Sequence, residues 1–271
     1  MTMDMPCSLV LRLAGPLQSW GERSQFNRRE TATEPTKSGI VGLLAAAQGR
    51  ARRDAIDDLA GLIMGVRTDQ PGSLLRDYHT VSDYRGGPLL SATVTTKGAQ
   101  KPTAKFTHVT ERYYLQDAAF VVALHGSAVL LWSLLEALAR PAFPLSLGRR
   151  ACVPTQPLVV RPTDGEHGAG QPGLWKGDPL SVLKLVPWQA SAERVRSLER
   201  QRVASEMIDL PVTIDDPAGD DRAADLPLSF DPPRRSFMER PIRRTWVSVQ
   251  TLVRCSGGPP AVHDPFSLLG W

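Results

Sequence analysis

The order of apolar segments in the first 160 residues most constrains the fold of this chain. Each segment has either the alternation of a half-buried strand or the capped apolar face of a helix. In chain order they predict strand, helix, strand, strand, helix, strand, which is the ferredoxin-like arrangement that RNA-recognition domains use. The segments are residues 8–14, 35–49, 64–69, 118–124, 128–139 and 150–160. We therefore expect an α+β, ferredoxin-like domain over residues 1–160.

Local signals fix the two principal helices. Residues 35–49 open with Pro, Thr and Ser and end at Gly49, and Ser127 precedes an apolar run that Pro141 stops. Ser and Thr accept hydrogen bonds from the free N–H groups of a first helical turn, and Pro cannot continue a helix. A further short helix is expected over residues 52–63.

A long insertion separates the second and third predicted strands. Between Tyr84 and Thr110 there is no acidic residue, and the segments TVTTK and KFTHVT flank a polar turn at Gly98. Thr-rich and Val-rich runs around a Gly-containing turn predict a β-hairpin. We expect a basic hairpin over residues 76–111 that projects from the domain. The positive side chains between Tyr84 and Thr110 are Arg85, Lys97, Lys101 and Lys105.

The remainder, residues 161–271, is expected to be a less regular β-containing region, with a short exposed helix over 191–208 and a strand over 245–254. The net charge is +4, but the charge is segregated: six arginines between positions 226 and 254 face only Asp231 and Glu239. Such segregation favours a polyanionic partner, although a solvated surface would carry the same charge.

Three motifs predict nucleic-acid contacts. In PTKSG, Lys37 and the N–H groups of Ser38 and Gly39 would lie at a helix N-terminus, where anions bind; an ordinary helix cap is the alternative. In LGRR, Gly148 precedes Arg149 and Arg150, which can pair with phosphates or base edges, or form a solvated loop. Aromatic residues next to basic ones can stack on bases, although each is more often core. Those residues are Tyr78, Tyr84, Phe106 and Tyr113.

Catalytic and metal-binding signals are few. The five histidines have no metal-ligand spacing, and Cys7, Cys152 and Cys255 are too dispersed for a zinc cluster, so no metal or cofactor is expected. Metal-independent RNA cleavage by Tyr78, His79 and Lys105 remains the enzymatic alternative. No apolar run is long enough to cross a bilayer, and we expect a cytoplasmic protein.

Five sequence blocks together resemble the CRISPR-associated CasD family, the RNA-binding subunits of type I-E Cascade. The blocks are LVLRLAGPLQSWG at 9–21, PTKSGIVGLLAAAQG at 35–49, LRDYHTV at 75–81, ERYYLQDAAFVVAL at 111–124 and FPLSLGRRACVP at 143–154. The resemblance implies a ferredoxin-like palm with a hairpin thumb that holds the repeat-derived 5′ handle of CRISPR RNA (crRNA). It also implies that the chain is not an enzyme, and that its neighbours are the backbone subunit CasC and the large subunit CasA, with target DNA nearby.

The resemblance also implies a set of RNA-binding residues, to which charge adds the hairpin cations and Arg112. Carried over by motif are Gln18, Trp20, Lys37, Ser38, Gly39, Tyr78, His79, Arg149 and Arg150. One departure is Ser146, where relatives can carry an aromatic residue. Related subunits of another Cascade subtype cleave precursor RNA, so endoribonuclease activity is the alternative. A protein-only scaffold that docks an acidic partner is a third hypothesis.

Overall fold

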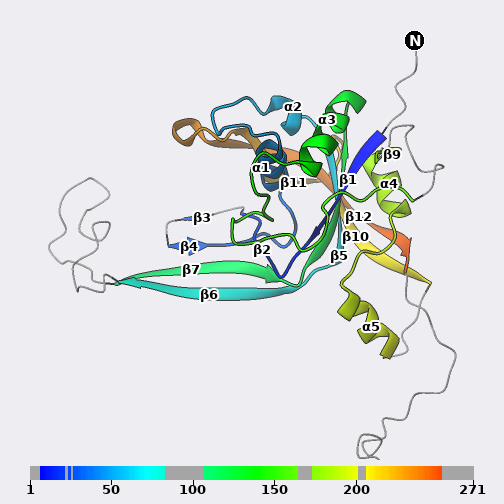
Figure 1. Ribbon diagram of the computed structural model, residues 1–271, viewed down its shortest axis with the longest axis horizontal. Helices are drawn as coiled ribbons and strands as arrows, with labels where there is room; N and C mark the ends of the chain where they lie inside the picture. The colour runs from blue at the N-terminus through cyan, green and yellow to red at the C-terminus, as the bar shows by residue number, and fades with distance from the viewer. Residues whose placement is uncertain are drawn as a thin grey trace, which may run out of the picture.

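Figure 1 shows a computed structural model of the chain. The structure describes residues 7–21, 24–25, 27–82, 107–163, 173–200 and 206–251. The fold is mixed α and β and is dominated by antiparallel sheet. None of the helices in these ranges is long and apolar enough to cross a membrane.

The main sheet has seven strands in the order β11-β12-β10-β5-β8-β1-β9, and each neighbouring pair is antiparallel. In chain order these strands are β1 (Cys7–Ala14), β5 (Ile63–Gln70), β8 (Ala119–His125), β9 (Trp175–Lys176), β10 (Met207–Asp215), β11 (Asp221–Ser229) and β12 (Ser236–Gln250). Because β10 pairs with β5, residues on both sides of position 160 share one sheet.

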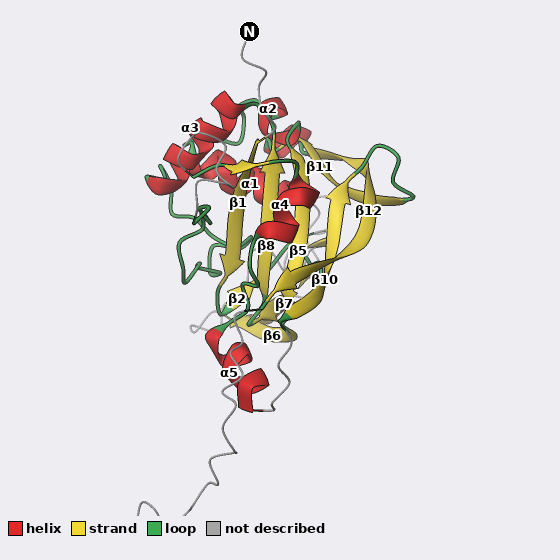
Figure 2. Ribbon diagram, turned by 90° about the vertical axis from the view of Figure 1, so that its right-hand side faces the viewer, coloured by secondary structure: helices red, strands yellow, loops and turns green. Residues whose placement is uncertain are grey.

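Helices cover both faces of this sheet. They are α1 (Lys37–Ala47), α2 (Asp57–Ala60), α3 (Ala128–Ala139), α4 (Pro179–Leu185) and α5 (Ala192–Arg200). Alternate residues of β8 point to opposite faces. Accordingly, Phe120 and Val122 join the cluster formed with α1 and α3, whereas Val121 and Ala123 join the cluster formed with α4. Figure 2 shows α4 in front of the central strands.

The predicted order β1, α1, β5, β8 and α3 is present. The side chains of Thr36 and Ser127 cap α1 and α3, and Gly49 has φ +76° just beyond α1. Two predictions in the first 160 residues were wrong. Helix α2 spans only Asp57–Ala60 instead of residues 52–63. Residues 150–160 form no strand beyond a single bridge between Leu11 and Val159, because Pro154 and Pro157 cannot donate ladder hydrogen bonds. Beyond residue 160, the predicted bounds 191–208 and 245–254 were also wrong, because α5 spans Ala192–Arg200, β10 begins at Met207 and β12 spans Ser236–Gln250.

The second sheet contains a long hairpin that projects from the body of the protein (Figure 1). Its strands β6 (Ser73–Ser82) and β7 (Thr107–Gln116) pair continuously from Ser73↔Gln116 to Ser82↔Thr107. The short strands β2 (Leu17–Gln18), β3 (Ser24–Gln25) and β4 (Arg28–Arg29) complete this sheet. The predicted cations Arg85, Lys97, Lys101 and Lys105 lie outside the described residues.

Candidate nucleic-acid interface

A cleft lies between the start of α1, strands β4 and β7, the loop at 147–150 and the C-terminal hairpin of β11 and β12. Its main cavity has a volume of about 410 Å³, and a second cavity of about 290 Å³ adjoins it. Four arginines line the main cavity, and we call it the arginine cleft. Those residues are Arg29, Arg112, Arg149 and Arg235.

The pairing of β4 with β7 concentrates positive charge in the arginine cleft. These strands are parallel, with Arg29 aligned with Arg112, so both side chains leave the sheet on one face. Among the described residues, no carboxylate forms an ion pair with Arg29, Arg112 or Arg235. Guanidinium groups that converge without ion pairs repel one another, and a bound polyanion relieves this repulsion.

Arg149 is held in place by the loop before it. Gly148 has φ +89°, and a Cβ at this position would lie 1.8 Å from the carbonyl oxygen of Ser19, so only glycine fits. The guanidinium of Arg149 lies 4.9 Å from the Tyr114 ring centre and donates a 2.8 Å hydrogen bond to the carbonyl oxygen of Arg29. Arg149 thus joins the loop to both β4 and β7 while lining the cleft. Its neighbour Arg150 is exposed and does not line the cleft.

At the start of α1, carboxylates of the protein itself occupy the Lys37 part of the predicted anion site. The N–H of Lys37 donates to Asp225 Oδ2 at 2.6 Å, and its Nζ donates to Asp215 Oδ2 at 2.7 Å. Lys37 is only 7% exposed. Its charge is therefore neutralised and unavailable to a ligand. Ser38 and Gly39 line the arginine cleft, and their contact with RNA stays a prediction.

Gln18 and Trp20 were expected to contact RNA, but both side chains are fully buried. Gln18 Nε2 donates to the carbonyl oxygens of Leu13 and Ala118, and its Oε1 accepts from Trp20 Nε1 at 3.1 Å. Trp20 in turn packs against α1: a Cβ on Gly39 would lie 2.7 Å from Trp20 Cε3. These two residues support the cleft from beneath, where Trp20 also borders the main cavity, and neither side chain has exposed surface for RNA.

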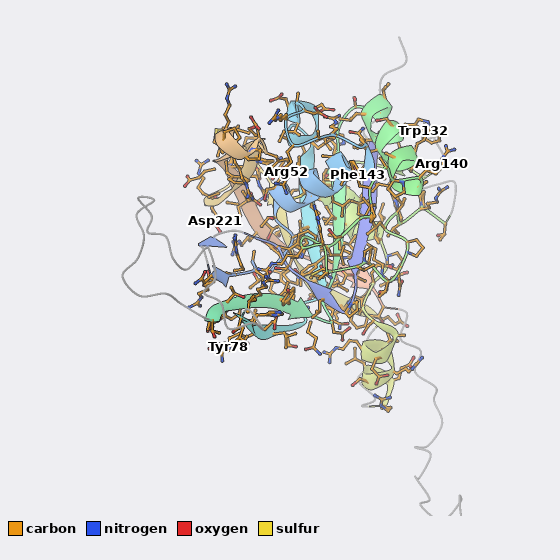
Figure 3. The ribbon with its side chains drawn as sticks, turned by 60° about the vertical axis from the view of Figure 1, so that its left-hand side comes forward. Arg52, Tyr78, Trp132, Arg140, Phe143 and Asp221 are labelled. Carbon is orange, nitrogen blue, oxygen red and sulfur yellow. The ribbon has the colours of Figure 1, made fainter. Side chains whose placement is uncertain are left out.

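Tyr78 and His79 lie on opposite faces of the projecting hairpin. Residues that pair across an antiparallel ladder share a face, so His79 lies on the face of Arg112 and Asp77, whereas Tyr78 lies with Glu111. His79 Nδ1 is 3.2 Å from Asp77 Oδ2. Tyr78 is 58% exposed and lies on the lower side of the hairpin in Figure 3.

Sequence analysis missed two of the cleft arginines. Arg29 lies in a polar loop outside the sequence motifs. Arg235 is one of six arginines between positions 226 and 254, and charge alone does not show which of these six would line a binding site. Arg29 reaches the cleft because β4 pairs with β7, and Arg235 reaches it because the connection before β12 lies near the start of α1. Both placements depend on contacts between residues that are distant in sequence.

Comparison with known proteins identifies the relatives of this chain. The profile of the CRISPR-associated protein family Cas5 matches residues 8–243. The chain belongs to this family. Cascade subunit CasD of Escherichia coli (strain K12) is 38% identical over 172 residues, which cover 56% of this chain and 69% of CasD.

Two solved structures extend the similarity to the fold of the Cas5 family. A chain of a CRISPR RNA-guided surveillance complex is 33% identical, with a TM-score of 0.68 over 94% of this chain and 95% of that one. A crystal structure of a Cas protein is 35% identical, with a TM-score of 0.61 over 89% of this chain and 94% of that one. The similarity therefore includes the C-terminal strands, which lie beyond the last of the five sequence blocks.

Proposed function

We propose that this protein is a non-catalytic, cytoplasmic RNA-binding subunit of a type I-E Cascade surveillance complex. The arginine cleft and the hairpin face that carries Arg112 hold the repeat-derived 5′ handle of crRNA. The convergence of four arginines on one cleft, none of which forms an ion pair with a described residue, carries this proposal. Family membership supports it, and so does the similarity to CasD and to a surveillance-complex chain.

The order of the central elements supports a palm-and-thumb description. Strands β5, β8 and β1 lie side by side, with α1 and α3 on one face, and the β6–β7 hairpin enters between β5 and β8. We therefore describe this core as a ferredoxin-like palm whose fourth strand is reduced to the bridge at Val159. In the complex, CasC and CasA would flank the subunit, with target DNA close to the start of the guide.

The geometry favours binding over cleavage. Adjacent residues of a strand point to opposite faces, so Tyr78 and His79 cannot act together on one phosphate. The observation that keeps cleavage as an alternative is that His79 and Asp77 share a face with Arg112, where a base and a cation would both meet RNA. A defined cut in repeat RNA that disappears in His79→Ala would favour this alternative.

Salt-dependent binding tests the proposal. The subunit, assembled with CasC, CasA and labelled crRNA, is compared with Arg112→Gln, and Arg52→Gln is the matched control because Arg52 is exposed on the α1–α2 loop. Loss of one phosphate contact should reduce the slope of log K against log salt by about 0.7, with weaker handle binding. An unchanged slope and affinity in Arg112→Gln, Arg29→Gln and their double variant would refute the proposal.

A further inference from the structure

We infer that the C-terminal hairpin of β11 and β12 forms the second wall of the arginine cleft and that Arg235 on this wall contacts the RNA. A buried network of charged residues around Arg240 positions the wall. The inference rests on the proposed function, because it assigns a role to residues at the same cleft. It gives the C-terminal part of the chain a direct part in RNA binding.

The wall presents a cation on an aromatic ring. Arg235 lines both cavities, and its guanidinium carbon lies 5.2 Å from the centre of the Phe237 ring. Phe237 lines the second cavity and is 40% exposed. Arg29 also lines both cavities. A nucleotide between Arg29 and Arg235 would meet a guanidinium group from β4 and one from the connection just before β12, with an aromatic ring available for a base.

The tip of the C-terminal hairpin is packed against α1. Phe230 follows β11 and packs against the main core cluster. Its Cζ would be 3.9 Å from a Cβ on Gly42, in the middle of α1. Figure 1 likewise shows β11 beside α1. The two walls of the cleft therefore share α1 as a common support.

A buried network of four charged residues, the anchor network, fixes the C-terminal hairpin to the start of α1. It consists of Lys37, Asp215, Asp225 and Arg240. Arg240 Nε donates to Asp225 Oδ1 at 2.7 Å, and Arg240 Nη1 also donates to Asp215. The same two carboxylates accept from the N–H and the Nζ of Lys37. The network thus links α1, β10, β11 and β12 through hydrogen bonds at both carboxylates.

The anchor network is electrically balanced, and its members depend on one another. Two cations face two carboxylates, and the side chains are 7–13% exposed. Burial disfavours the charged form of Arg240, but the hydrogen bonds and charges of Asp225 and Asp215 outweigh burial and raise the pKa of Arg240. Removal of one member would leave a buried charge without its counter-charge. We expect such a change to displace the hairpin that carries Arg235.

The first test compares neighbouring arginines in the complete complex with crRNA. Arg235→Gln should weaken handle binding several-fold and reduce the salt slope by about 0.7, because one contact to single-stranded RNA is lost. Arg234→Gln is the matched control, since Arg234 is exposed and lines neither cavity. Equal affinities and slopes for Arg235→Gln and the wild type would overturn the inference. If Arg112→Gln still weakens binding in that case, the proposed function stands without it; if neither variant does, the proposed function fails.

The second test separates positioning from general stability. RNA crosslinks are mapped to residues 235–237 and to residues 109–114 in complexes with Arg240→Met and with the conservative Arg240→Lys. A positioning role predicts that Arg240→Met loses the crosslinks at 235–237 but keeps those at 109–114, and that Arg240→Lys restores part of the loss. Retention of both sets in Arg240→Met would overturn the positioning role. If Arg240→Met does not assemble, Asp225→Asn in the same experiment tests it, because the asparagine keeps the shape of the side chain.

Discussion

Two glycines in α1 allow the packing beneath the cleft to be tested with a matched pair of substitutions. A Cβ on Gly39 would lie 2.7 Å from Trp20 Cε3 and 3.1 Å from Thr36 Oγ1, whereas a Cβ on Gly42 would meet only Phe230 Cζ at 3.9 Å. Alanine in place of glycine stabilises a helix by up to about 1 kcal/mol. Forcing a methyl group into a packed core costs about 1–3 kcal/mol. Gly42→Ala should therefore stabilise the protein, and Gly39→Ala should be less stable than Gly42→Ala by about 1–3 kcal/mol.

The clash at Gly39 cannot be relieved cheaply, because Trp20 is fully buried and its Nε1 is hydrogen-bonded to Gln18. For a chain of this size, 1 kcal/mol corresponds to roughly 2–4 °C in melting temperature, so thermal unfolding followed by circular dichroism resolves the difference. Handle binding should also weaken in Gly39→Ala, because α1 would shift relative to the cleft. A Gly39→Ala protein as stable as Gly42→Ala would show that Trp20 does not restrain α1.

Three further substitutions test other parts of the structure. Burial raises the pKa of Glu34 despite a hydrogen bond from Thr213. The ionised side chain therefore destabilises the folded state above this raised pKa, and the cost is lost as pH falls through the raised pKa to the ordinary glutamate pKa. Glu34→Gln should raise the melting temperature near pH 7, and an equal gain near pH 4 would contradict this origin. Gln18→Leu would remove one donor from the carbonyl oxygens of Leu13 and Ala118 and the acceptor of the buried Trp20 N–H, and urea denaturation should show a loss of about 1–3 kcal/mol, the usual cost of an unpaired buried group. Ser127→Ala should cost about 1 kcal/mol through loss of the α3 cap, whereas Ser133→Ala, within the same helix, should cost less.

The sequence predicted those parts of the fold that local signals specify. Capping residues and apolar periodicity fixed α1 and α3, and apolar runs fixed β1, β5 and β8. Strands β10 and β11 were not predicted: each contains a proline, Pro211 in β10 and Pro227 in β11, and β11 has no apolar alternation. Their strand conformation depends on the long partner β12, which pairs with both. The tendency of a segment to form a strand depends on such cross-strand neighbours, and a short stretch of sequence does not reveal which segments will pair.

The candidate site was predicted in part for a related reason. Sequence motifs located the loop of Arg149 and the first turn of α1, and charge located Arg112. Charge could not distinguish a free cation from a neutralised one, because the carboxylates that neutralise Lys37 lie 178 and 188 residues away. Gln18 and Trp20 were misassigned because a motif shared with relatives can support a site from inside the core as well as line it.

Under the proposed function, the division between cations that are neutralised in the anchor network and cations without ion pairs would let one cleft be both stable and attractive to RNA. The anchor network is internally neutral, so it holds α1 and the C-terminal hairpin together without adding net charge to the cleft. The field in the cleft then comes from the arginines that line it, none of which belongs to that network. If Asp225 did not occupy the start of α1, a phosphate could bind there, but the hairpin that carries Arg235 would lose its attachment. The protein therefore uses the positive end of α1 to fix its own architecture, and in the proposed function anion binding falls to guanidinium groups, whose planar donors suit phosphate.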